Sequence, residues 1–77
     1  MKFQAELTDL FCGEANYLWC RRAEFDLPDD ATDRQIVVKA KSELGLTGLR
    51  CRRFDHGEGF ELRPYGLLQI AFISPIH

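Results

Sequence analysis

One helix signal, standing between two stretches of alternating residues, is the feature that most constrains this fold. Thr32 followed by Gln35 has the spacing of a capping box, in which each side chain bonds to the other residue's backbone N–H. Gly45 stands where a helix would end in the left-handed conformation that glycine tolerates. These signals predict one helix over residues 33–44, about three turns long.

Two runs before the helix alternate between apolar and polar residues, which is the period of a half-buried strand. The first run covers residues 2–11 and the second covers residues 17–27, with turn-forming residues at 12–16 between them. Pro28 cannot donate to a sheet ladder, so the second strand is expected to stop there. The two runs are predicted to pair as a hairpin.

Three shorter runs follow the helix. Residues 49–54 alternate again, a glycine-rich turn is predicted over 55–59, and residues 60–63 form a short fourth strand. After a turn at 64–66, residues 67–73 are apolar on both faces, which is typical of a central or doubly covered strand. The predicted order is ββαβββ, an α+β fold in which a small antiparallel sheet of four or five strands carries one helix on one face.

The apolar stripe of the helix predicts what it covers. Ile36, Ala40 and Leu44 are spaced to lie on one helical face. We expect this face to pack against four strand residues: Phe25, Leu62, Ile70 and Phe72. One helix covers only one side of the apolar run at residues 67–73, so a homodimer is expected to cover the other side.

Length and composition indicate one globular domain. A chain of 77 residues has room for a single hydrophobic core, so one domain is expected over residues 1–77. Hydrophobic residues make up 45% and charged residues 29%, which separates the chain from disordered proteins. No apolar run approaches the ~20 residues of a membrane-spanning helix. Glu6 stands where a secretory signal would be apolar, so a cytoplasmic protein is expected.

The cysteines give no sign of a disulfide framework or of a metal site. Cys12, Cys20 and Cys51 are odd in number and irregular in spacing, and we expect reduced thiols. A zinc site completed by His56 or His77 is the alternative, but no C-x-x-C or H-x-x-x-H pair is present. The expectation is a protein without metal or cofactor.

Few groups in the sequence are suited to catalysis. There is no nucleophile elbow, phosphate loop or paired-histidine metal motif. Cys51 and His56 could in principle form a thiolate nucleophile, yet Cys51 alternates with arginines along a strand and His56 belongs to a turn. We therefore expect no enzyme, and no catalytic residue, but a protein that works by binding.

Charge is distributed unevenly along the chain. Residues 1–33 carry three basic and eight acidic residues, a net charge of −5, whereas residues 34–77 carry seven and four, a net charge of +3. Five acids crowd the end of the second strand and the start of the helix, and we name them the acidic cluster: Glu24, Asp26, Asp29, Asp30 and Asp33.

The acidic cluster has a structural and a functional interpretation. Acids near a helix start stabilise the helix dipole and solvate a loop. The same acids would also imitate nucleic-acid phosphates and steer the protein onto a basic partner. On the functional interpretation, the acidic cluster is the candidate partner-binding surface.

Arginines support a rival interpretation. Five of them recur near Tyr17, Trp19 and Phe54, as in sheets that stack bases and pair with phosphates: Arg21, Arg22, Arg50, Arg52 and Arg53. A pI near 5.6 is low for a domain whose affinity rests on counterion release. A nucleic-acid-binding module is the alternative function, a structural or interaction subunit is a third, and the arginines can also simply pair with nearby acids.

Two segments resemble short bacterial and prophage proteins of no assigned chemistry. They are GEANYLW at residues 13–19, followed by Arg21 and Arg22, and GLTGLRCR at residues 45–52. In size and α+β layout the chain is also similar to the anti-CRISPR proteins, small phage-encoded inhibitors that bind CRISPR effector complexes. Those proteins share no motif, so the resemblance assigns no residue. It implies an inhibitor without cofactor that blocks nucleic-acid or nuclease access to a Cas effector complex in the host cytoplasm.

Overall fold

The computed structural model describes residues 1–11 and 14–76, with side chains at 1–10 and 19–76. The element order is ββαβββ, as predicted. The elements are β1 (Lys2–Phe11), β2 (Glu14–Asp26), α1 (Asp33–Leu44), β3 (Cys51–His56), β4 (Gly59–Pro64) and β5 (Gln69–Pro75).

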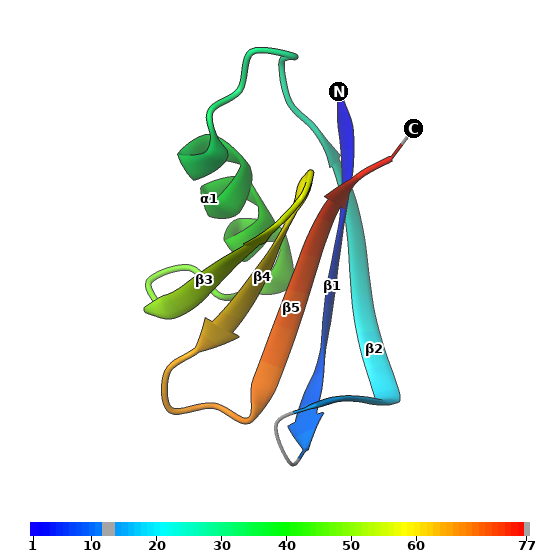
Figure 1. Ribbon diagram of the computed structural model, residues 1–77, viewed down its shortest axis with the longest axis vertical. Coiled ribbons are helices and arrows are strands. Elements are labelled where there is room, and N and C mark those ends of the chain that lie inside the picture. Colours follow the sequence, from blue (N-terminus) through cyan, green and yellow to red (C-terminus); the bar gives the residue numbers. More distant parts are fainter. Residues whose placement is uncertain (12–13, 77) are drawn as a thin grey trace.

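All five strands form one antiparallel sheet, and α1 packs against one of its faces (Figure 1). The strand order is β2-β1-β5-β4-β3, so the first and last strands pair in the middle while β2 and β3 form the two edges. The β1–β5 ladder runs from Phe3 opposite Pro75 to Asp9 opposite Gln69. The prediction of a central fifth strand is confirmed.

The ends of α1 are set by the residues that the sequence indicated. The Gln35 backbone N–H donates to the Thr32 hydroxyl at 3.2 Å, and the Thr32 N–H donates to the Gln35 side chain at 2.9 Å, which completes the capping box. Gly45 adopts a φ of 74° and closes the helix. In the described part of the chain, no helix is long and apolar enough to span a membrane.

The face of the sheet that meets α1 carries the hydrophobic core, and we call it the covered face. Phe3 and Phe25 stack across β1 and β2 with ring centroids 5.6 Å apart. The main core side chains are Phe3, Ala5, Leu7, Phe25, Ile36, Ala40, Leu44, Leu46, Phe60, Leu62, Ala71 and Ile73. Phe25 and Leu62 belong to the same core as Ile36, Ala40 and Leu44 of α1, as predicted.

The expectation that Ile70 and Phe72 also meet α1 is wrong. Ala71 pairs with Leu7 and belongs to the core beneath the helix. Side chains alternate along a strand, so Ile70 and Phe72 point to the opposite side of the sheet, which we call the open face. A strand that is apolar on both faces gives no sequence signal of which set faces the helix.

Several predicted turns differ in length from the expectation. Residues 14–16 belong to β2, while residues 12 and 13 lie outside the described residues. The β1–β2 register shifts between Thr8 and Asp9, and the Thr8 hydroxyl donates to the Trp19 carbonyl at 2.6 Å at this irregularity. Leu67 and Leu68 precede β5 in an exposed loop, because the turn at Gly66, with a φ of 80°, delays the strand.

Candidate functional site

The acidic cluster lies at one end of the molecule. Glu24 and Asp26 end β2, Asp29 and Asp30 follow in the loop, and Asp33 opens α1. All five residues are exposed. Figure 1 places this loop at the same end as the N- and C-termini. The fold therefore keeps together the acids that the sequence grouped.

Only part of this negative charge is balanced. Lys2 Nζ lies 4.0 Å from Glu24, and the amino group of Met1 lies 3.1 Å from Asp29. Within the described residues, the other three acids of the cluster form no ion pair: Asp26, Asp30 and Asp33. The helix dipole accounts for Asp33 in the first turn of α1, but Asp26 and Asp30 lie outside the helix.

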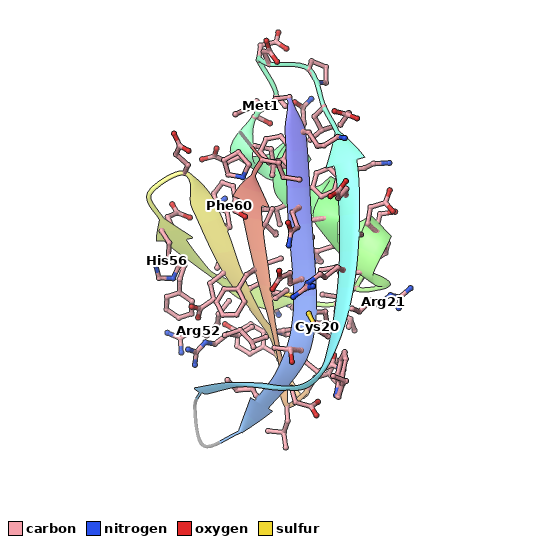
Figure 2. The ribbon with its side chains drawn as sticks, turned by 90° about the vertical axis from the view of Figure 1, so that its right-hand side faces the viewer. Met1, Cys20, Arg21, Arg52, His56 and Phe60 are labelled. Carbon is pink, nitrogen blue, oxygen red and sulfur yellow. The ribbon has the colours of Figure 1, made fainter. Side chains whose placement is uncertain are left out.

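The five arginines of the alternative hypothesis do not share one surface. Arg52 and Arg53 are neighbours in β3, so they point to opposite faces. Arg21 approaches Gly45 at the end of α1, whereas Arg22 points to the open face. Figure 2 shows Arg21 at the β2 margin of the sheet and Arg52 at the β3 margin. Arg50 precedes β3 and is exposed.

The open face instead carries a row of side chains that crosses all five strands. Strand registers align, in order from β3 to β2, Phe54, Glu61, Phe72, Glu6 and Arg22. Glu6 accepts from the Arg22 guanidinium at 3.2 Å. Glu61 accepts from Arg63 at 2.6 Å and lies 3.1 Å from His56 Nε2. Both carboxylates of the row are thus paired with cations or with histidine.

Phe54 holds two guanidinium groups at the β3 side of the open face. Arg52 lies 5.2 Å and Arg63 lies 5.5 Å from its ring centroid, within cation–π range. Arg63 is already paired with Glu61. Arg52 has no ion pair with any described residue, so its charge is available to an anion. Tyr17, predicted beside the arginines, lies outside the described side chains.

A shallow groove of about 520 Å³ opens where β4 meets the end of β5. Its lining includes His56, Glu61, Phe72 and Ser74. His56 Nε2 is engaged by Glu61, and no hydrogen bond joins His56 to Ser74 among the residues that the structure describes. The groove therefore has no nucleophile paired with a base, although it contains a hydroxyl and an imidazole.

Cys51 and His56 also remain apart. Cys51 lies on the covered side of β3, and His56 points to the open face. Burial raises the pKa of the Cys51 thiol, and Lys41 only partly offsets this, so the group is not an activated thiolate. Among the described side chains, those of residues 1–10 and 19–76, no group of three metal-ligating residues occurs; Cys12 and His77 lie outside these ranges.

Sequence reasoning missed Glu6, Glu61 and Arg63, which organise the open face. Each is an ordinary charged residue in an alternating strand, and only the cross-strand register brings them into one row. The signal that could have found them is the alternation of polar residues along each strand, which places these side chains on one side of the sheet. Comparisons with family models, curated proteins and solved structures gave no match. The acidic cluster and the open face are therefore the two surfaces on which a function can be argued.

Proposed function

We propose that the protein is a small non-catalytic inhibitor that binds a basic macromolecular surface through its acidic cluster. The supporting observation is that five exposed acids lie at one end and that Asp26, Asp30 and Asp33 have no ion pair among the described residues. Uncompensated negative charge attracts a complementary surface and accelerates encounter with it.

The partner that best suits this surface is a protein whose own ligand is nucleic acid. Such a protein presents rows of lysine and arginine to phosphates, and carboxylates can occupy the same positions. A Cas effector complex, implied by the likeness to anti-CRISPR proteins, has this chemistry. The inhibitor would block nucleic-acid or nuclease access by occupying the channel, and it would need no cofactor.

The test is binding to purified Cas effector complexes, with nucleic-acid occupancy as the second readout. The variant Asp26→Lys, Asp29→Lys, Asp30→Lys should lose binding, because it reverses the charge at one end of the fold. A control with Ser42→Lys and Thr47→Lys adds positive charge near the other end of α1 and should bind normally. Higher salt should slow association of the wild type more than dissociation. Equal binding by the reversed variant contradicts the proposal.

Nucleic-acid binding is the second candidate, and the stack of Arg52 and Arg63 on Phe54 favours it. Guanidinium groups and aromatic rings on an open sheet face are the usual means of holding single strands. Fluorescence anisotropy with a labelled single-stranded oligonucleotide tests this directly. Arg52→Glu should abolish binding, while Arg53→Glu, on the opposite face of the same strand, should reduce it only slightly. No measurable binding by the wild type at low salt excludes the second candidate.

A further inference from the structure

β2 lies at one edge of the five-stranded sheet. Its inner side pairs with β1 from Asp26 opposite Lys2 to Cys20 opposite Thr8. Over residues 20–26, no described residue forms a backbone hydrogen bond to the outer side. Unpaired N–H and C=O groups along an edge are a template for adding another strand.

The inner hydrogen bonds determine which groups point outward. The Leu27 N–H donates to the Met1 carbonyl at 3.0 Å, so Leu27 bonds toward β1. Backbone groups alternate between the two sides along an antiparallel strand, so Phe25, Ala23 and Arg21 also bond inward. The residues whose N–H and C=O groups point outward are Cys20, Arg22, Glu24 and Asp26.

These outward residues restrict how a second copy can pair. In an antiparallel arrangement centred on Ala23, Arg22 of each copy lies opposite Glu24 of the other. Moving the centre to Arg22 places two arginines opposite each other, and moving it to Glu24 places two glutamates opposite each other. Like charges in directly opposed positions destabilise a sheet, whereas opposite charges stabilise it. The arrangement centred on Ala23 combines complementary charge with full overlap of the outward residues.

We propose that two copies of this chain join their β2 edges antiparallel about Ala23, so that one continuous sheet crosses both copies. Four opposed pairs of outward residues supply roughly eight backbone hydrogen bonds. Arg22, whose side chain is 66% exposed, keeps its contact with Glu6 and gains Glu24 of the second copy. Asp29, Asp30 and Asp33 lie beyond the joined segment, one set at each end, whereas Glu24 and Asp26 of the acidic cluster lie within it.

The other edge and the open face are weaker surfaces for a second copy. β3 has six residues against thirteen in β2, and its Arg53 and Asp55 already pair with each other at 3.1 Å. On the open face, Ile70 is only 2% exposed within a single copy. The sequence-based reason for a dimer was that the fifth strand would be uncovered on one side, and this reason does not apply to Ile70. The β2 edge is therefore the better surface for a second copy.

Cross-linking tests the geometry of this dimer. In a variant with Cys12, Cys20 and Cys51 replaced by serine, Ala23→Cys should form a disulfide-linked dimer under mild oxidation. Opposed residues of this non-hydrogen-bonded type have Cα atoms about 4.5 Å apart, within disulfide range. Val38→Cys, whose parent residue is 58% exposed on α1, is the matched control and should remain largely monomeric. Equal cross-linking at both positions overturns the proposal.

Sedimentation equilibrium tests the charge pairing without any cross-link. Glu24→Arg should raise the dimer Kd about tenfold, because two attractive pairs become repulsive. Adding Arg22→Glu to that variant should restore the dimer, since the pairs are then exchanged. A wild type that stays monomeric to millimolar concentration overturns the dimer and leaves the inhibitor proposal standing. A dimer unaffected by Glu24→Arg overturns the β2 interface.

Discussion

On the covered face Leu62 and Ile73 are each 1% exposed beneath α1, whereas on the open face the carboxylates of Glu61 and Glu6 keep 12% and 21% exposure and contact arginines. Both faces belong to the same strands, yet they are held by different forces. Apolar burial scales with the area removed from water, while an ion pair such as Arg22–Glu6, whose arginine side chain is 66% exposed, contributes little. The covered face should therefore contribute most of the stability, and loss of an exposed charge on the open face should cost little.

The largest expected effect comes from deleting a side chain on the covered face. Leu62→Ala should lower the free energy of unfolding by about 2–5 kcal/mol, because it removes a fully buried side chain and leaves a cavity. Urea denaturation measures the change. Arg52→Ala, on the open face of the neighbouring strand, is the control and should cost far less. Equal losses from the two variants would contradict the difference between the faces.

Gly59 tests how tightly β4 approaches β5. A Cβ at this position would lie 2.6 Å from the backbone oxygen of Ile73, so alanine forces the two strands apart. We expect Gly59→Ala to destabilise the protein by about 1–3 kcal/mol, in the range of overpacked sites. Thermal unfolding measures it, with Ser74→Ala, at an exposed residue nearby, as the control. A melting temperature equal to that of the wild type would show that the strands separate freely.

Thr32 tests how α1 is fixed above the covered face. Thr32→Ala removes the oxygen that accepts from the Gln35 backbone, and about 1 kcal/mol of stability should be lost. Thr32→Ser keeps the acceptor and should retain most of the stability. If alanine and serine behave alike in chemical denaturation, the helix does not depend on this cap.

The smallest effect is expected for an ion pair on the open face. Arg22→Ala should cost only about 0.2–1 kcal/mol, because the Arg22 side chain is 66% exposed and solvent screens its contact with Glu6. A double-mutant cycle with Glu6→Gln, in protein dilute enough to remain monomeric, isolates the pair. The coupling should fall further as salt rises. A coupling of several kcal/mol that is insensitive to salt would place this pair among the main stabilising contacts.

The helix and the order of the elements along the chain were predictable because local chemistry determines them. Thr32, Gln35 and Gly45 set both ends of α1 from within the helix itself. The side of the sheet to which a side chain points was predictable only where polar and apolar residues alternate along the strand, as they do around Phe3 and Phe25. Along β5 both faces are apolar, so the sequence could not distinguish Ile70 from Ala71 as the residue beneath the helix.

The two candidate surfaces also differ in whether the sequence could predict them. The acidic cluster was predictable, since its five members lie close together in the chain and a short loop keeps them so. The row that contains Glu6 and Glu61 was not, because its members come from different strands and their alignment depends on register across the whole sheet. That Arg52 and Arg53 point to opposite faces, by contrast, follows from their being neighbours in a strand, and it could have been inferred from the sequence.

The pairing of the first strand with the last has a consequence for how the chain acquires its structure during synthesis. Residues 3–9 must wait for residues 69–75 before the middle of the sheet can form. Until then the nascent polypeptide holds at most two separate hairpins with exposed edges, and the closing contacts span nearly its full length. The sheet should therefore close only after residues 69–75 have been synthesised, and stalled or truncated products lacking the last strand should be prone to aggregate and to engage chaperones.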